Sequence, residues 1–300
     1  MYATRITERV RMLDTYALGQ PKTVCAYLVR GPKPTLVDCG YATSSESVLA
    51  GLAECGIMPS EVRYLIPTHV HLDHAGAAGR LLKEMPNATV IAHERSVKHL
   101  VDPTKLIESA TRVFGEAIVR LYGAPDPVPE GRITAVGEEL HLDLGDGLSV
   151  VAIHTPGHAP HQISVLLENS KSLITADAVG IVYPGMGALI PTTPPPSFDP
   201  GGLAASIRKL EGTEPTSLLV PHFGPRSDPA WVFRNTLEKV DEWVEKVGSH
   251  RKRGLGLDQI ALAMEEEVER EAGVSDLPIY ASVSVRTSVM GILDYLDRKA

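Results

Sequence analysis

Hydrophobic and polar positions along the first half of the chain predict strands that alternate with helices. Apolar runs of strand length occupy residues 24–29, 35–38, 62–66 and 89–92. A Gly-Pro-Lys-Pro turn joins the first two runs as a hairpin. Apolar residues recur at helical spacing over about 44–56, where Thr43 and Glu46 form a capping-box pattern, and again over about 76–84. Such alternation is typical of an α/β fold.

Short strand patterns return between residues 132 and 178, after a helical segment over 103–123. The strand-like runs cover 139–144, 148–154, 163–167 and 172–176. We therefore expect a second sheet, and two packed sheets with helices outside form a four-layer αββα sandwich. Segment 180–200 is rich in proline and glycine, which predicts an irregular loop.

Beyond residue 223 the pattern becomes helical, over about 229–247, 257–272 and 282–298. The sequence therefore predicts an αββα domain at residues 1–227 and a small helical C-terminal extension at 228–300. A chain of 300 residues, of which 43% are hydrophobic, can bury one large core with such an extension.

Composition and charge narrow the classes of partner. The formal net charge of −8 opposes tight binding to a phosphate backbone, because that binding depends on Lys and Arg displacing counterions. No apolar run approaches the roughly 18 residues of a membrane span, and the N-terminus lacks the apolar segment of a secretory signal. We expect a cytoplasmic protein that binds neither nucleic acid nor membranes, and homo-oligomerisation stays open. Cys25, Cys39 and Cys55 form no CxxC pair and are expected to be reduced.

Four potential metal ligands, His69, His71, Asp73 and His74, follow the strand run 62–66. Imidazole and carboxylate groups suit zinc, iron or manganese. The first three alternate as at the end of a strand, and the fourth turns into a helix. The four side chains can therefore spread around one turn and serve two adjacent ions.

Three further candidates, His158, Asp177 and His222, each follow a short apolar β run, where side chains emerge at the rim of a sheet. With the unbroken HxHxDH signature at 69–74, they resemble the metallo-β-lactamase superfamily over roughly residues 20 to 225. The resemblance implies the αββα fold and two divalent transition-metal ions, zinc or else iron or manganese.

The implied ligands form two sets of three with a shared carboxylate. They are His69, His71 and His158 for the first ion, Asp73, His74 and His222 for the second, and Asp177 as the bridge. Two ions about 3.5 to 4 Å apart can share a hydroxide, since coordination lowers the pKa of water to about 7. Asp73 is also the expected catalytic residue, orienting that nucleophile.

The sequence allows two interpretations for each of two residues near the predicted ligands. Asp38 matches the family's early Asp, and it fits a turn-forming role as well as a role in orienting a ligand histidine. His161 lies three residues after His158 and is otherwise typical of a structural histidine. The basic run at 251–253 fits a solvated cluster better than an anion site.

The bridging Asp177 favours the glyoxalase II and lactonase subgroup, because true β-lactamases lack that bridge. We expect a hydrolase that cleaves an ester, thioester or lactone of a small molecule. Quorum-signal lactonases carry a Tyr three residues after the bridge, whereas this chain has Gly180 there and Tyr183 nearby. The alternatives are a mononuclear-iron sulfur dioxygenase, a β-lactamase, and a phosphodiesterase or nuclease. Tyr183 and Phe198, in the apolar loop 180–200, are the expected substrate contacts.

Overall fold

The structure is a computed structural model that describes residues 1–299. Within this range the strands form two sheets, and those of the first lie side by side in chain order: β1 (Ala3–Arg5), β2 (Val10–Asp14), β3 (Cys25–Val29), β4 (Thr35–Val37), β5 (Tyr64–Ile66), β6 (Thr89–His93) and β7 (Ile133–Val136). The second has the spatial order β13 (Gly224–Arg226), β12 (Ser217–Val220), β11 (Ser172–Ile174), β10 (Ile163–Leu167), β9 (Leu148–His154) and β8 (Glu139–Gly145).

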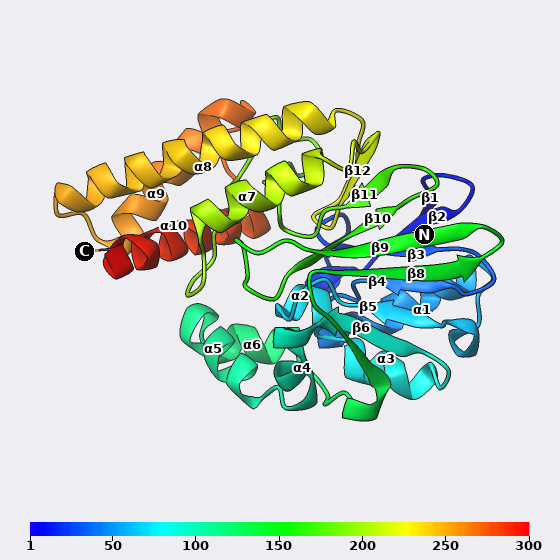
Figure 1. The fold of residues 1–300 in the computed structure, drawn as a ribbon. Coiled ribbons are helices and arrows are strands. Elements are labelled where there is room, and N and C mark those ends of the chain that lie inside the picture. Colours follow the sequence, from blue (N-terminus) through cyan, green and yellow to red (C-terminus); the bar gives the residue numbers. More distant parts are fainter. Residues whose placement is uncertain (300) are drawn as a thin grey trace.

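Helices cover the outer faces of the two sheets. The helices of the first half are α1 (Ser45–Glu54), α2 (Leu72–Ala75), α3 (Ala78–Glu84), α4 (Glu94–Val101), α5 (Thr104–Phe114) and α6 (Glu116–Tyr122). Those of the second half are α7 (Pro200–Glu211), α8 (Pro229–Lys252), α9 (Leu257–Ala272) and α10 (Ile279–Lys299). Figure 1 shows these two groups on opposite sides of the sheets, the second coloured yellow-green to red. The expected αββα sandwich is confirmed.

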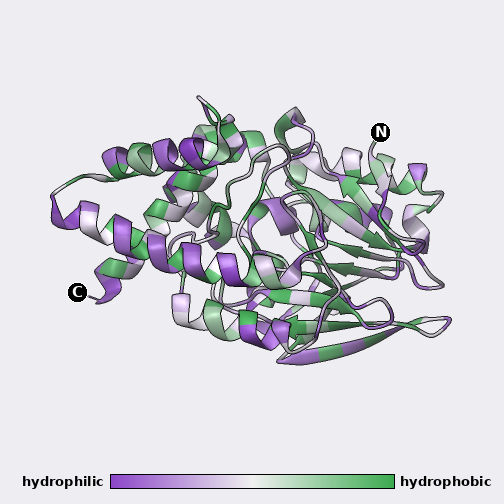
Figure 2. Ribbon diagram, turned by 90° about the horizontal axis from the view of Figure 1, so that it is seen from above, coloured by the Kyte–Doolittle hydropathy of each residue, from purple (hydrophilic) through white to green (hydrophobic). Residues whose placement is uncertain are grey.

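The core between the sheets combines side chains of both, such as Tyr27 and Ile66 from the first and Val165 and Ile174 from the second. All five residues of β3 are buried, because its other face packs under helices. A strand covered on both faces is apolar throughout rather than alternating. Accordingly, Figure 2 shows hydrophobic residues concentrated on the strands and hydrophilic ones on the outer helices.

The predicted hairpin is confirmed, and one strand was missed from the sequence. The hairpin of β3 and β4 is present, with Leu28 opposite Leu36. The strand β7 is not among the predicted runs; it pairs with β6 in parallel, Val90 opposite Ile133, and so extends the first sheet. A parallel pair needs a long crossover connection, and α4 to α6 provide it here.

Two predicted helix boundaries also differ. The helix α1 starts after a 3₁₀ turn, and its N-cap Ser44 makes no side-chain capping bond, so the expected capping box is absent. Thr43 instead donates from Oγ1 to the carbonyl of Tyr122, at 3.2 Å. The single helix expected over 103–123 breaks at Gly115, whose φ of 84° ends α5 and begins α6.

The helices α8 to α10 confirm the helical character of the C-terminal segment. They share one hydrophobic cluster with the second sheet, in which Trp243 and Val285 belong to the same group as Leu173 and Leu218. The division at residues 227 and 228 stays a prediction. Among the helices of residues 1–299, none has the length and hydropathy needed to cross a bilayer.

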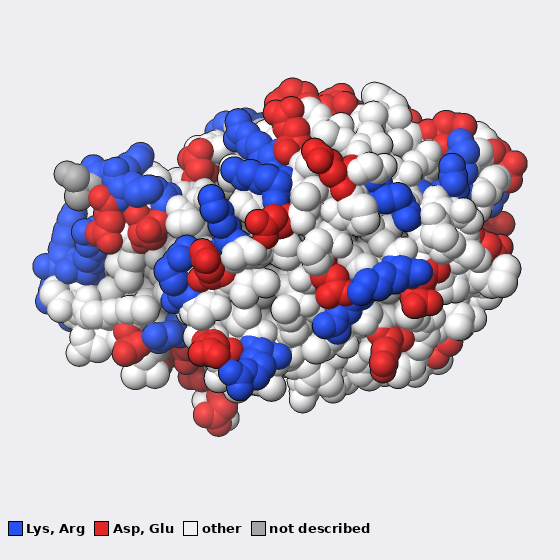
Figure 3. All heavy atoms as spheres, turned by 90° about the horizontal axis from the view of Figure 1, so that it is seen from below, with Lys and Arg blue, Asp and Glu red and all other residues white. Residues whose placement is uncertain are grey.

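Surface charge is mixed on the face shown in Figure 3, except at the end near the C-terminus, where Lys and Arg side chains gather. In that region Arg251 forms an ion pair with Asp297 across α8 and α10. The three cysteines are free thiols, with Cys25 and Cys39 fully buried.

Candidate metal centre

The predicted ligands lie where strands of both sheets end at one edge of the sandwich. The strand β5 ends at Ile66, and the following turn leads into α2, which carries Asp73 and His74. His158 follows β9, Asp177 follows β11 and His222 follows β12. Strands that end at the same edge bring residues from distant parts of the chain into one small volume.

Backbone hydrogen bonds between the sheets hold this edge together. The N–H of Ile163 donates to the carbonyl of Thr68 at 2.8 Å, which ties the histidine-rich turn to β10. The N–H of Cys25 donates to the carbonyl of Pro221 at 2.8 Å, directly before His222. The turns that carry ligands are therefore fixed relative to each other before any ion binds.

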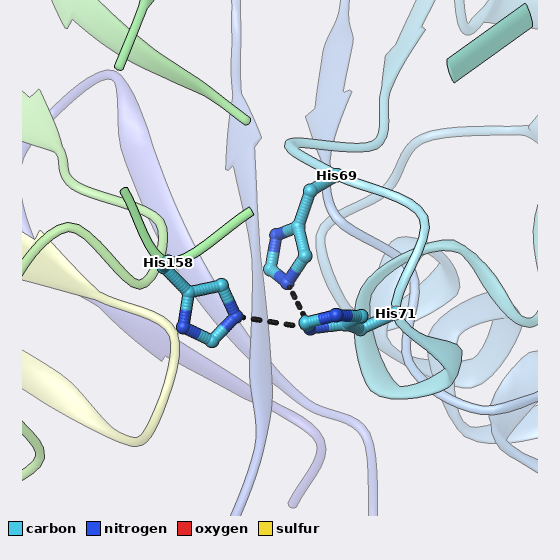
Figure 4. Close-up of side chains that lie close together, drawn as sticks. All are labelled: His69, His71 and His158. Carbon is cyan, nitrogen blue, oxygen red and sulfur yellow. Dashed lines mark hydrogen bonds between the residues drawn. The ribbon is translucent and has the colours of Figure 1, made fainter. Parts of the chain in front are cut away.

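The first group consists of His69, His71 and His158, whose rings converge in Figure 4. The Nδ1 atom of His71 lies 2.9 Å from Nε2 of His69 and 2.9 Å from Nε2 of His158. Burial lowers the pKa of all three imidazoles, that of His71 to about 3, so they are neutral near pH 7. A single N–H on Nδ1 of His71 cannot donate well to both neighbouring Nε2 atoms. A cation between the three nitrogens would instead accept a lone pair from each imidazole.

The second group consists of Asp73, His74 and His222. Nε2 of His74 lies 3.6 Å from Oδ2 of Asp73, and Nε2 of His222 lies 3.9 Å from the same oxygen. Asp177 lies between the two groups. Its Oδ2 is 3.4 Å from Nε2 of His158 and 3.5 Å from Nε2 of His74, and its Oδ1 is 3.4 Å from Nε2 of His222.

Hydrogen bonds on the far side of two imidazoles fix which nitrogen faces the centre. Nδ1 of His158 lies 3.0 Å from the carbonyl of Thr192, which can only accept, so Nε2 is left unprotonated. Nδ1 of His74 lies 2.9 Å from Oδ2 of Asp38, and Oδ1 of Asp38 accepts from the N–H of Thr68 at 2.8 Å. Of the two interpretations of Asp38, the structure supports the one that orients a ligand histidine.

The electrostatics of the second group favour positive charge. Burial acts to lower the pKa of His74, but the carboxylates of Asp73, Asp177 and Asp38 outweigh it and raise that pKa well above its usual range. Burial is likewise outweighed at His222, whose pKa is raised by Asp177. Burial acts to raise the pKa of Asp177, yet the neighbouring imidazoles hold it well below its usual range. A divalent cation would take the place of these protons.

Unpaired buried atoms test whether a metal fits this site. Among the described residues, Nε2 of His74 and Oδ1 of Asp177 are buried without a hydrogen-bond partner. An unsatisfied buried polar atom costs about 1–3 kcal/mol. Both atoms face the space shared by the two groups, and coordination would satisfy both. The donor set of imidazoles and carboxylates therefore fits two transition-metal ions.

The two expected substrate contacts are placed differently. Tyr183 lies beside the centre, its ring centroid 6.3 Å from that of His222, and its hydroxyl is 2.9 Å from Oγ of Ser284. Phe198 does not reach the centre. Its side chain is 0% exposed and packs against Tyr295 with ring centroids 5.8 Å apart, so hydrophobic burial and not ligand contact explains it.

Two tyrosines near Asp73 were missed from the sequence. Tyr41, after β4, stacks on Tyr122 of α6 with ring centroids 4.2 Å apart and an interplanar angle of 10°. Burial raises the pKa of Tyr122 to about 12, and the nearby charge of Asp73 contributes. His161 also borders the site, 6.3 Å from His71 between ring centroids, with its Nδ1 buried and unpartnered. The stacked Tyr41 and Tyr122 are far apart in the chain, so their contact gives no local sequence signal.

Comparison with known families decides the identity of the fold. A family model described as the metallo-beta-lactamase superfamily matches residues 20–222. The chain belongs to this superfamily. It is 31% identical over 179 residues to the metallo-beta-lactamase fold-containing protein ST1585 of Sulfurisphaera tokodaii, covering 58% of this chain and 63% of ST1585.

Other relatives agree with this membership. The chain is 32% identical over 136 residues to the N-acyl homoserine lactonase AttM of Azorhizobium caulinodans, covering 44% of this chain and 47% of that protein. These matches thus span between about half and two thirds of the relatives' length. The crystal structure of the metallo-beta-lactamase family protein TTHA1429 from Thermus thermophilus superposes with a TM-score of 0.71 at 19% identity, over 98% of this chain and 95% of that one, which shows the same fold.

Proposed function

We propose that this member of the superfamily is a dinuclear-metal hydrolase that cleaves an ester, thioester or lactone of a small molecule. One observation carries the proposal: the carboxylate of Asp177 lies between the two ligand groups, within 3.5 Å of His158, His74 and His222. A bridging carboxylate suits two ions held close together and agrees with the glyoxalase II and lactonase subgroup. The similarity to a lactonase points to the same class.

Two zinc ions bound here would supply Lewis acidity and lower the pKa of a water nucleophile to about 7. The residues of the chain then have separate tasks. His158 and His74 present unprotonated Nε2 atoms because Thr192 and Asp38 hold their Nδ1–H groups. The side chain of Asp73, which is 20% exposed, is the ligand carboxylate most open to solvent, so it is placed to accept the proton of the attacking water.

Aromatic side chains make up part of the expected substrate contact surface. Tyr41 and Tyr122 lie on the side of Asp73, and Tyr183 lies on the side of His222. Tyr122 and Tyr183 are buried, whereas Tyr41 is partly exposed and would offer an apolar face to an acyl group.

The mononuclear-iron sulfur dioxygenase is the main alternative, because it would need only three ligands. Metal content separates the two. After purification without chelators we expect about two ions per chain, since seven donor side chains exceed what one tetrahedral ion uses. A reproducible single iron, together with oxygen consumption on a persulfide, would contradict the proposal.

The direct test is a hydrolysis panel on metal-depleted and zinc-reconstituted protein. The panel contains a thioester, an aryl ester, an acyl homoserine lactone, a β-lactam and a phosphodiester. Zinc-dependent turnover of at least one of the first three, abolished in Asp73→Asn, is expected. Turnover confined to the β-lactam or the phosphodiester, or turnover that Asp73→Asn retains, would refute the proposed reaction.

A further inference from the structure

One face of α10 lies along the irregular loop that follows Asp177. Tyr280, Ser284, Ser288 and Gly291 recur at intervals of four, four and three, which puts them in one row on the helix. Tyr280 and Ser284 contact Tyr183, through rings 4.7 Å apart and the 2.9 Å hydroxyl contact described above. The next two residues of the row contact the loop backbone.

Ser288 is buried and uses its backbone and its hydroxyl to hold this loop. Its Oγ donates to the carbonyl of Pro191 and accepts from the N–H of Thr193 at 3.5 Å. The hydroxyl of Thr193 donates in turn to the backbone carbonyl of Ser288 at 3.1 Å. Both neighbours of Thr192 are thus bonded to a single helical residue almost one hundred positions later.

Gly291 lets the helix come this close. A Cβ atom at this position would lie 1.9 Å from the carbonyl oxygen of Thr193 and 2.5 Å from the carbonyl carbon of Pro194. Contacts of this length do not occur, so any side chain would push the loop away from α10. Gly291 and Ser288 therefore act together on the same short stretch of the loop, residues 191–194.

Thr192 is the loop residue that touches the metal centre. Its carbonyl accepts the Nδ1–H of His158 at 3.0 Å. Its hydroxyl lies 2.9 Å from the carbonyl of Asp177 and 3.1 Å from that of Val179, and donates to them. One residue thus contacts a ligand of the first group and the backbone of the bridging carboxylate.

We propose that Ser288 and Gly291 are positioning residues of the metal centre, which fix Thr192 and thereby aim His158 and Asp177 at the ions. The inference rests on the proposed function only in requiring that ions bind at these ligands. Partners that orient metal ligands are worth roughly 10- to 100-fold in metal affinity. Ser288 acts one residue further out, so we expect about a tenfold effect, the lower end of that range.

The test measures zinc affinity by competition with a chromophoric chelator, using full-length Ser288→Ala. Ala is a better helix former than Ser, so α10 itself is not weakened. Ser282→Ala is the matched control, since Ser282 lies on the same helix and its side chain makes no hydrogen bond among the described residues. We expect about tenfold weaker zinc binding in Ser288→Ala, an altered cobalt absorption spectrum, and wild-type values for both in Ser282→Ala.

Other outcomes separate this inference from its alternatives. If Ser288→Ala lowers the melting temperature of the metal-free protein but keeps wild-type affinity and spectrum, the serine is merely structural and the inference is overturned. Gly291→Ala should weaken zinc binding at least as much, and wild-type binding by a folded Gly291→Ala protein would also contradict the proposal. If the wild-type chain itself binds no zinc, the proposed function fails and the inference fails with it.

Discussion

Replacing Asp38 by Asn changes one heavy atom and should weaken the binding of the second ion. The carboxylate accepts two hydrogen bonds, from the N–H of Thr68 at 2.8 Å and from Nδ1 of His74 at 2.9 Å. An Asn in the same place has one accepting oxygen. If that oxygen keeps Thr68, the amide nitrogen faces Nδ1 of His74 and donates to it. The proton of His74 must then move to Nε2, the atom that faces the centre.

The magnitude follows from the loss of the correct tautomer. Orienting partners of metal-bound histidines contribute about 10- to 100-fold in affinity, which corresponds to about 1.4–2.7 kcal/mol. The backbone adds little, because Asp38 has a φ of 59° and Asn adopts this left-handed region readily. The opposite amide orientation would place two donors against each other at Thr68, so neither orientation of Asn restores the native arrangement.

Zinc titration followed by calorimetry is the appropriate assay. Asp38→Asn should bind the first ion with near-normal affinity and the second about 10- to 100-fold more weakly, with hydrolysis falling in parallel. Asp143→Asn is a control, since Asp143 is an exposed residue paired with Lys33 away from the centre. If Asp38→Asn binds two ions with wild-type affinity, the reasoning about the His74 tautomer is refuted.

Three further predictions concern other parts of the molecule. Asp73→Asn should lose at least about 100-fold in kcat/KM, as expected for a proton-accepting group. The unfolding midpoint of the metal-free protein should change little. A small kinetic effect would argue against the proton-accepting role. Phe198→Ala should lower the free energy of unfolding in urea by about 3–5 kcal/mol, because the ring is fully buried. It should leave KM unaltered. A raised KM with normal stability would instead support Phe198 as a substrate contact. Burial raises the pKa of Cys25 to about 12, and it also raises the pKa of the half-buried Cys55. Near pH 8 a thiol reagent should therefore modify Cys55 slowly and the fully buried Cys25 only after unfolding. Rapid labelling of Cys25, located by peptide mass, would contradict its burial.

The convergence of the predicted metal ligands could be foreseen because the sequence pattern that marks these residues is local. Four of them stand within the 69–74 segment, and the others directly follow apolar β runs whose ends can be read from periodicity alone. Which strands pair with one another was harder to predict from the sequence. The strand β7 was missed because it is short, and its parallel partner β6 is separated from it by a long crossover. Phe198 was predicted to contact the substrate because the sequence shows that a residue is apolar but not whether it lines a pocket or fills the core.

The positioning of the ligands could not be predicted for a different reason. Thr192 contributes a backbone carbonyl, which every residue possesses, and Ser288 contacts the loop from 95 positions away. Neither contact leaves a pattern at short range. The structure was needed to show that Asp38 orients His74, since a turn-forming aspartate would give the same local sequence.

The irregular loop depends on α10 for part of its hydrogen bonding. Residues 180–200 form one isolated bridge, between Ile181 and Ile190, and otherwise lack the regular hydrogen bonds of a sheet or helix. Buried carbonyls in such a segment need partners. Ser288 of α10 donates to the buried carbonyl of Pro191, and Arg298 donates to the carbonyls of Pro196 and Phe198. A loop without internal support cannot hold a ligand-orienting carbonyl in place by itself. The helix that satisfies the loop therefore also determines how accurately His158 is aimed.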